Sequence, residues 1–130
     1  MILDTDFMID LMDKQPAAVD KYKECLVRDE PIHTTALTIF ELFTGVFRSN
    51  RSIEEKEKVA KILQGKPILH LDAKAGERAG EWHGTLMKKG EMINVIDTLI
   101  AGIALTKKEK VLTRNTKDFS KIKGLMVETY

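Results

Sequence analysis

The opening stretch MILDTDFMIDLM, residues 1–12, joins a short apolar run to an acid and then to apolar residues at helical spacing. We interpret Met1–Asp4 as a buried strand and Phe7–Met12 as a short helix that follows it. A strand that passes directly into a helix is typical of α/β proteins. Such folds bind ligands at the carboxyl ends of their strands, so the stretch also marks Asp4 as a candidate site residue.

The rest of the chain repeats this alternation. Four further strands are expected, at residues 31–35, 67–71, 110–113 and 126–128. Five longer helices are expected, at residues 16–27, 36–47, 52–64, 73–89 and 97–108. Strands that alternate with helices predict a parallel sheet covered on both faces, and the length suits one domain over residues 1–130.

Several residues predict where helices begin. Pro16 suits the first position of a helix, and Asp72 suits an N-cap. Ser52 followed by Glu55 matches a capping box. Asp97 opens the apolar run TLIAGIAL, and at a helix N-terminus the helix dipole would favour its ionised form.

The composition is that of a folded globular protein, with 43% hydrophobic and 32% charged residues. No apolar run approaches the roughly 18–20 residues that a membrane span needs. The start of the chain has no basic segment or cleavage site typical of a signal peptide, and Cys25 is the only cysteine. These features predict a cytoplasmic protein without a membrane partner, an internal disulfide or a zinc cluster.

Four acids far apart in the sequence are expected at one edge of the sheet. Asp4 ends the first strand, Glu41 lies early in the helix after the second, Asp97 begins the apolar helix, and Asp118 follows the strand that ends at Thr113. Carboxylate oxygens are ligands suited to Mg²⁺ or Mn²⁺. Because clustered carboxylates repel one another, the pattern indicates a cation more than acid–base chemistry alone.

Each acid also has a structural interpretation. Asp97 is a plausible helix N-cap, Asp4 could cap the helix at Phe7, and Asp118 could be a turn or cap residue. Glu41 is harder to explain in this way because it lies on a largely apolar helix, where a buried carboxylate needs a partner or a metal.

Several other polar and aromatic residues are expected to have structural and not catalytic roles. Asp10 is interpreted as a solvated surface acid, and Asp6 as either a surface acid or a group supporting the site. Trp82 is expected to pack in the core or an interface. The same is expected of three phenylalanines at helical spacing, Phe40, Phe43 and Phe47.

Four segments together resemble the motifs of the PIN-domain family, in its VapC toxin branch. They are MILDTDFMIDLM, TTALTIFELFTGVF, GEMINVIDTLIAGIAL and VLTRNTKDF, and they occur in the family's order and spacing along the whole chain. The resemblance implies a three-layer α/β/α domain with a five-stranded parallel sheet. It also implies an Mg²⁺- or Mn²⁺-dependent ribonuclease that acts on RNA, forms a homodimer and is held inactive by a cognate VapB-like antitoxin.

The resemblance also implies roles for individual residues. Asp4 and Asp97 would be the principal metal ligands, Glu41 a further ligand or the residue that orients the attacking water, and Asp118 a variable fourth acid. Three polar residues would hold the carboxylates or a phosphate: Thr5, Thr113 and Asn115. This chain departs from the family pattern twice: position 6 is Asp where Asn or Ser is commoner, and position 115 is Asn where some relatives carry an acid.

Basic residues near the fourth motif have two open interpretations. Arg114 and Lys117, with Lys121 and Lys123 beyond them, could guide RNA phosphates to the site, or they could form an ordinary solvated surface. If the four acids were occupied by metal, the remaining charge would be 21 − 16 = +5, which is compatible with modest attraction of phosphate.

Two alternative functions remain open from the sequence. One is a catalytically silent PIN-fold module that binds RNA or protein. The other is a phosphatase of the haloacid-dehalogenase type, because Asp4-Thr5-Asp6 fits a D-x-D element after a strand. The second fits less well, since Met8 stands where that scheme expects Thr or Val and Asp118 has no closely spaced acidic partner.

Overall fold

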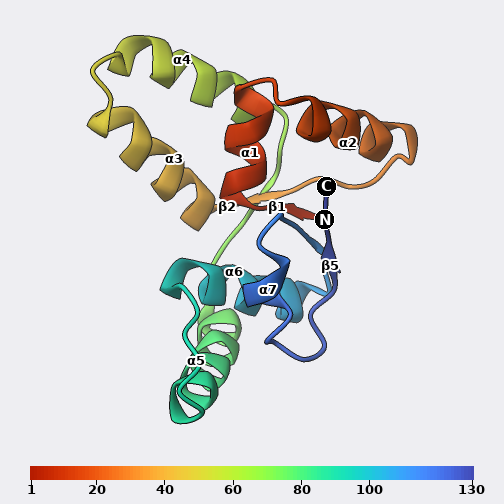
Figure 1. The fold of residues 1–130 in the computed structure, drawn as a ribbon, viewed down its shortest axis with the longest axis vertical. Coiled ribbons are helices and arrows are strands. Elements are labelled where there is room, and N and C mark those ends of the chain that lie inside the picture. Colours follow the sequence, from red (N-terminus) through yellow and green to blue (C-terminus); the bar gives the residue numbers. More distant parts are fainter.

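The computed structural model describes residues 1–130, in which five short strands alternate with seven helices (Figure 1). The strands are β1 (Ile2–Leu3), β2 (Thr34–Thr35), β3 (Ile68–Leu69), β4 (Val111–Leu112) and β5 (Val127–Glu128). The helices are α1 (Thr5–Met12), α2 (Pro16–Val27), α3 (Ala36–Arg48), α4 (Ser52–Leu63), α5 (Ala73–Lys88), α6 (Val95–Lys107) and α7 (Thr116–Phe119). None of these helices has the length and apolar character needed to cross a bilayer.

All strand pairs are parallel, but they form two sheets. One sheet has the order β1-β4-β5 and the other pairs β2 with β3. A single bridge between Ile2 and His33 joins the sheets. The prediction of one continuous five-stranded sheet is therefore wrong in detail. The chain turns from β1 into α1 and from β2 into α3 within a residue or two, so the pairing between these strands ends after one bridge.

Helices cover both faces of the strands. In Figure 1, α1 to α4 lie on one side of the strands, and α5 and α6 lie on the other. Met1, Leu3 and Leu112 belong to the core on the α1–α4 side, whereas Ile2 and Val111 belong to the core on the α5–α6 side. This alternation follows from the period of two in a strand, and it confirms the predicted layers of helix, strand and helix.

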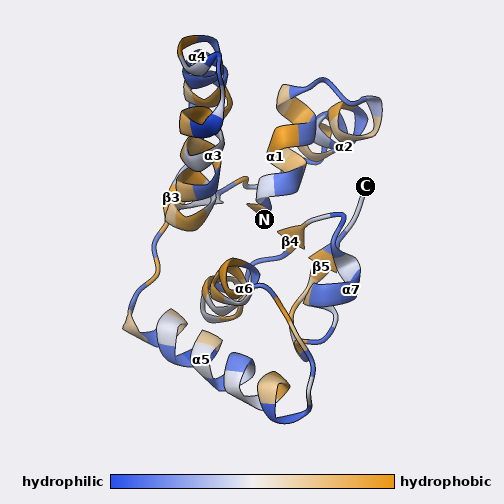
Figure 2. Ribbon diagram, turned by 60° about the vertical axis from the view of Figure 1, so that its left-hand side comes forward, coloured by the Kyte–Doolittle hydropathy of each residue, from blue (hydrophilic) through white to orange (hydrophobic).

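Helix α6 is held against α5 by close backbone packing. A Cβ atom at Gly102 would lie 2.4 Å from the carbonyl oxygen of Ala75 and 2.8 Å from Cβ of Ala79, so only glycine fits there. Figure 2 shows α6 as largely hydrophobic beside the more polar α5. This packing fixes the helix whose first turn carries Asp97.

The beginnings of three helices agree with the sequence patterns to different degrees. Pro16 is the first residue of α2, and the Asp72 side chain caps α5, as predicted. Helix α1 begins at Thr5 instead of Phe7, because Asp4 caps it directly after the strand. The strand and the helix are therefore separated by one residue only.

The predicted capping box at the start of α4 does not form. The helix does begin at Ser52, but Arg51 occupies the N-cap position and no side chain caps the helix. The carboxylate of Glu55 instead accepts a bond of 3.2 Å from Lys58, one turn further on. An ion pair with Lys58 therefore replaces the return bond to the cap.

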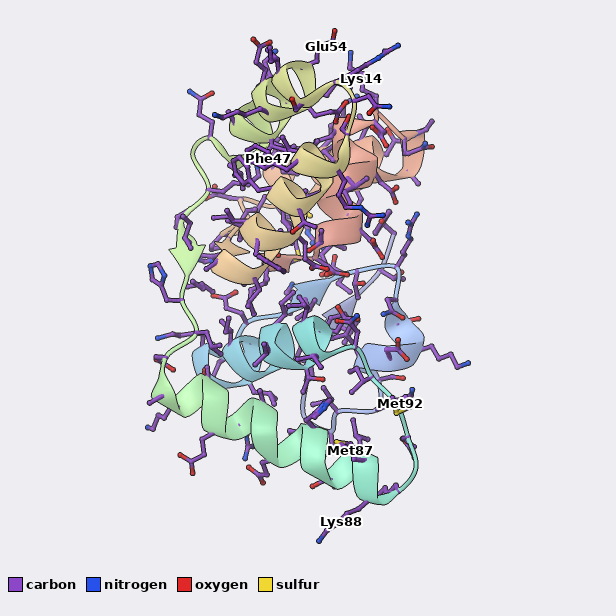
Figure 3. All side chains as sticks on the ribbon, turned by 90° about the vertical axis from the view of Figure 1, so that its left-hand side faces the viewer. Lys14, Phe47, Glu54, Met87, Lys88 and Met92 are labelled. Carbon is purple, nitrogen blue, oxygen red and sulfur yellow. The ribbon has the colours of Figure 1, made fainter.

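The aromatic residues divide between core and surface. Trp82 and Phe43 are half-buried and pack against the cores, as predicted. Phe40 and Phe47 are 61% and 74% exposed, so neither belongs to the core. Figure 3 labels Phe47 on α3. Helix α3 instead buries a different face, formed by Thr38, Leu42 and Val46.

Candidate active site

A small polar pocket lies where β1 ends and helices α1 and α6 begin. Its volume is about 180 Å³, and all of its lining side chains are polar: Asp4, Thr5, Asp6, Glu41, Asn94 and Asp97. The pocket therefore brings together three of the four acids that the sequence singles out. The fourth, Asp118, lies outside the lining.

Asp4 is the residue between β1 and α1, and both of its carboxylate oxygens are bonded. Oδ1 accepts from the backbone N–H of Thr5 at 2.8 Å, as a helix cap, and Oδ2 accepts from the hydroxyl of Thr113 at 2.7 Å. Burial raises the pKa of Asp4 to about 6, although both hydrogen bonds act to lower it. The capping interpretation is therefore correct for Asp4, but a helix cap does not require a carboxylate so buried that its pKa is raised.

Asp97 is not the helix cap that its position suggested. Helix α6 begins two residues earlier, and the side chain of Asn94 accepts from the backbone N–H groups of Ile96 and Asp97 at 2.8 and 3.4 Å. Since asparagine is among the best capping residues, it satisfies these N–H groups. The carboxylate of Asp97 is thereby free to line the pocket.

The protonation of Asp97 reflects its neighbours. Burial, followed by repulsion from Asp4, Glu41 and Asp118, raises its pKa to about 7. A hydrogen bond of 3.1 Å from the Asn115 amide to Oδ2 acts in the opposite direction. Burial and the neighbouring like charges therefore raise the pKa of Asp97 even though it lies in the first turn of a helix.

Glu41 reaches the pocket from the middle of α3. It is half-buried, and its Oε1 accepts from the hydroxyl of Thr5 at 2.6 Å. Thr5 thus contacts two acids, donating its backbone N–H to Asp4 and its hydroxyl to Glu41. Glu41, for which the sequence offered no capping role, therefore lies on α3 with its side chain in this pocket.

Asp118 is connected to the pocket through Asn115. It lies in the short helix α7, which the sequence did not predict. The Asn115 amide lies 3.1 Å from Asp97 and 3.1 Å from Asp118, and Lys121 donates to Asp118 at 3.0 Å. The Lys121 bond lowers the pKa of Asp118, which makes this acid unlike the two whose pKa values are raised.

The basic residues and Asp10 differ from the sequence interpretation. Asp10 is not a free surface acid, because it accepts from Arg114 at 2.8 Å and from the hydroxyl of Tyr130 at 2.6 Å. Arg114 also lies 3.9 Å from Asp6, so two acids compensate its charge. Lys117 is exposed and forms no ion pair. Among the basic residues near the fourth motif, Lys117 and Lys123 are therefore outside any ion pair, whereas Arg114 and Lys121 are paired.

Sequence reasoning missed Asn94, Asp10 and Tyr130. Asn94 had a usable signal, because an asparagine three residues before an acid in an apolar helix suits a cap. Tyr130 had none, since it meets Asp10 across 120 residues of sequence.

The pocket suits a hard divalent cation in its donor chemistry. Carboxylates, a hydroxyl and an amide line it, and no histidine or cysteine does. No three acidic, histidine or cysteine side chains stand close enough together to hold a metal ion by themselves in this structure. Mg²⁺ usually binds one or two carboxylates and keeps several waters, so a ready-made cage of three side chains is not required.

The fold and the pocket together define a class of protein: small α/β domains with an acidic pocket at the carboxyl ends of parallel strands. Within that class, the sequence model of the PIN domain matches residues 1–125, and the chain belongs to the PIN domain family. The alternative of a haloacid-dehalogenase phosphatase is therefore wrong.

Similar proteins carry the name VapC. "Ribonuclease VapC2" of Rickettsia felis is 28% identical over 129 residues, which cover 99% of this chain and 96% of the relative. The "tRNA(fMet)-specific endonuclease VapC" of Shigella flexneri is 24% identical over 135 residues, covering 99% and 96%. The resemblance to the VapC branch is thus confirmed along the whole chain.

Solved structures of toxin–antitoxin complexes contain similar chains. A chain of VapBC2 from Rickettsia felis, bound to a DNA fragment from its promoter, has a TM-score of 0.89 at 27% identity, with 99% of this chain and 97% of that chain covered. A chain of VapBC-1 from nontypeable Haemophilus influenzae has a TM-score of 0.86 at 26% identity, covering 98% and 96%.

Proposed function

We propose that this protein is an endoribonuclease, the toxin of a VapBC-type toxin–antitoxin pair, which hydrolyses RNA phosphodiester bonds with the help of Mg²⁺ or Mn²⁺. The observation that carries the proposal is the pocket in which Asp4, Glu41 and Asp97 meet from three distant segments. The raised pKa values of Asp4 and Asp97 support it, because they indicate negative charge that no basic side chain in the pocket lining compensates.

Asp4 and Asp97 are the residues that would hold the metal ion. Thr113 and Asn115 each donate one bond to these acids and so fix the direction of their carboxylates. A bound Mg²⁺ or Mn²⁺ would supply charge stabilisation for the phosphate and a water of lowered pKa.

Glu41 would orient the attacking water and accept its proton. The hydroxyl of Thr5 holds Oε1 of Glu41, which leaves the other oxygen for the water. Carboxylates commonly take this role when they lie within hydrogen-bond reach of the water. Asp118 would act at one remove, through Asn115, and is the least important of the four acids.

The partners proposed for this chain follow from its relatives. A VapB-like antitoxin is proposed because similar chains are found in VapBC complexes. A homodimer is proposed from the family resemblance alone. Lys117 is the stronger candidate for contact with RNA phosphates because its side chain is exposed and forms no ion pair, whereas Arg114 is already paired. A cytoplasmic location is proposed on the sequence features alone.

Cleavage of RNA by the purified protein tests the proposal. Mixed structured RNAs would be incubated with the protein and Mn²⁺, with EDTA and the Asp4→Asn variant as controls. Asp20→Asn is the matched variant, because Asp20 is exposed on α2 and forms no ion pair. Cuts that need Mn²⁺ and Asp4 but not Asp20 would support the nuclease. If the protein binds Mn²⁺ without cutting any RNA, the chain is better described as a silent PIN-fold binding module.

A further inference from the structure

One three-residue segment holds both of the pocket's principal acids. The hydroxyl of Thr113 donates to Asp4 at 2.7 Å, and the amide of Asn115 donates to Asp97 at 3.1 Å. The backbone N–H of Asn115 in turn donates to the Thr113 hydroxyl at 2.9 Å. The placement of residues 113–115 therefore fixes the direction of two carboxylates, one from the residue that caps α1 and one from the first turn of α6.

The middle residue of this segment, Arg114, is bonded to Asp10 on α1. Nη1 of Arg114 donates to Oδ2 of Asp10 at 2.8 Å, and the hydroxyl of Tyr130 donates to the same oxygen at 2.6 Å. We call these three residues the Asp10 anchor. The anchor joins α1, the segment after β4 and the C-terminal end of the chain.

The acid and the tyrosine of the anchor are shielded from solvent, whereas the side chain of Arg114 is 55% exposed. The Asp10 side chain is only 13% exposed, although it lies at a helix surface. The Tyr130 ring packs edge-on against Phe7, with ring centroids 4.7 Å apart and planes at 81°. Phe7 is fully buried on the same helix as Asp10. The tyrosine is therefore held by its ring, so its hydroxyl has a fixed direction toward Asp10.

The anchor connects the two sides of the pocket. Asp4 caps α1, and Asp10 lies on the same helix, so a bond from Asp10 to Arg114 ties α1 to the segment that holds Asp97. If the anchor loosens, residues 113–115 can shift relative to α1, and the separation of Asp4 and Asp97 changes with them. Outer groups that orient metal ligands matter in this way in many metal sites.

We propose that Tyr130 and Asp10 are positioning residues, which act through Arg114 to set the relative placement of Asp4 and Asp97. The inference rests on the proposed function of this pocket as a metal-dependent RNA-cleaving site. It assigns Arg114 to the support of the site and not to the binding of RNA. Neither Tyr130 nor Asp10 touches substrate in this role.

The Tyr130→Phe variant tests the proposal while keeping the aromatic ring against Phe7. Its control is Tyr22→Phe, which removes a hydroxyl from a ring that packs beneath Lys66 and has no hydrogen bond. At 25 °C, where both variants are expected to be folded, we expect Tyr130→Phe to lower kcat about 10-fold with KM unchanged. We expect it to weaken Mn²⁺ binding by roughly the same factor.

The Arg114→Gln variant separates positioning from RNA contact. If Arg114 acts through the segment, this variant lowers kcat at constant KM, and combining it with Tyr130→Phe adds little further loss, because both changes break one chain of contacts. A rise in KM with unchanged kcat would overturn the assignment, because it would place the guanidinium on the RNA.

The test also distinguishes failure of this proposal from failure of the proposed function. Mn²⁺ affinity is measured by calorimetry without RNA, and the amide exchange of Asn115 is measured by NMR without metal. If the parent protein neither cleaves RNA nor binds Mn²⁺, the proposed function fails. The anchor is then tested by exchange alone: faster exchange of the Asn115 amide in Tyr130→Phe than in Tyr22→Phe would show that the anchor holds residues 113–115 in place. Equal exchange, or equal Mn²⁺ affinity where the parent binds Mn²⁺, overturns the positioning role.

Discussion

The carboxylate of Glu128 and the carboxylates of the acidic pocket have opposite electrostatic surroundings. Glu128, at the end of β5, accepts from three basic side chains: Lys21 at 2.8 Å, Arg28 at 2.7 Å and Lys110 at 3.2 Å. These partners, Lys21 above all, lower the pKa of Glu128 to about 2. The fold therefore compensates this acid fully with its own cations.

Asp4, Glu41 and Asp97 in the acidic pocket have no such ion pair; of the lining acids only Asp6 has a basic neighbour, Arg114 at 3.9 Å. The pocket lining contains no lysine or arginine, and the pKa values of Asp4 and Asp97 are raised to about 6 and about 7. A chain with 21 basic residues could have supplied a partner here, as it does for Glu128. The comparison teaches that the pocket keeps an electrostatic cost, and such costs are typical of functional sites. A divalent cation would remove it.

The largest effect expected from this comparison is on catalysis. Asp97→Asn removes a charge from the pocket while keeping the size of the side chain, so RNA cleavage should fall by more than about 100-fold, beyond the loss typical of an outer supporting group. The melting temperature without metal should not fall, because a repelling charge has gone. Cleavage assays and thermal unfolding on the same preparation check both. Full activity in this variant would rule out the assigned role of Asp97.

The next largest effect is the response of stability to metal. Because Mn²⁺ would bind only the folded pocket, a concentration of 100 times Kd should stabilise the protein by about 2.7 kcal/mol, or roughly 10 °C in Tm. Thermal unfolding with and without MnCl₂ measures this shift. The shift should vanish in Asp4→Asn and persist in Asp20→Asn; a shift that persists in Asp4→Asn would place the ion elsewhere.

The two groups of acids should also give opposite dependences of stability on pH. The pKa values of Asp4 and Asp97 are raised above their ordinary value of 3.8. Their contribution to the stability of the folded state is therefore fully present below about pH 4, and it is lost as the pH rises through about 6 and 7. Glu128 behaves oppositely, since its contribution is present above 4.5 and is lost as the pH falls through about 2. Without metal, Tm should therefore fall as the pH is raised from 4 to 7.

The Asp97→Asn variant is the control for this pH dependence. Unfolding followed by circular dichroism at a series of pH values should give a smaller decrease in Tm for the variant than for the parent protein. Identical pH profiles for the two proteins would mean that Asp97 does not carry the effect.

The smallest effect is expected at the compensated acid. Glu128→Gln removes the charge that three cations share, and it should lower the free energy of unfolding by about 1–2 kcal/mol, since the group is partly shielded from solvent. Urea unfolding measures the loss. Glu24→Gln is the control, because Glu24 pairs with Lys21 and Arg28 while half-exposed, and should cost close to nothing. Mn²⁺ binding should be unchanged in both variants.

The parts of the site that follow strands could be predicted from the sequence. Asp4 directly follows an apolar run, and Glu41 lies on an apolar helix where a carboxylate has few structural uses, so local pattern was enough to single out both. Asp97 lines the pocket as the sequence suggested, but the position of its helix was predicted inaccurately. Its helix begins earlier than the apolar run suggests, because Asn94 and not Asp97 caps it.

Other features depend on contacts that local patterns do not encode. The division into two sheets follows from how soon each strand turns into its helix, and the position of Tyr130 follows from packing against Phe7, far away in sequence. The apparent capping box at Ser52 shows the converse, because a local motif was present but Glu55 found a different partner in Lys58. Long-range packing therefore sets the sheet division and the place of Tyr130, whereas at Ser52 one local interaction replaced another.

The central claim is that the uncompensated acidic pocket is a divalent cation site. Calorimetric titration of Mn²⁺ into the parent protein, Asp97→Asn and Glu128→Gln at pH 7.5 tests it most directly. The account predicts saturable binding in the parent protein, the same binding in Glu128→Gln, and loss of binding in Asp97→Asn. Equal binding in all three proteins, or no binding in the parent protein, would contradict it.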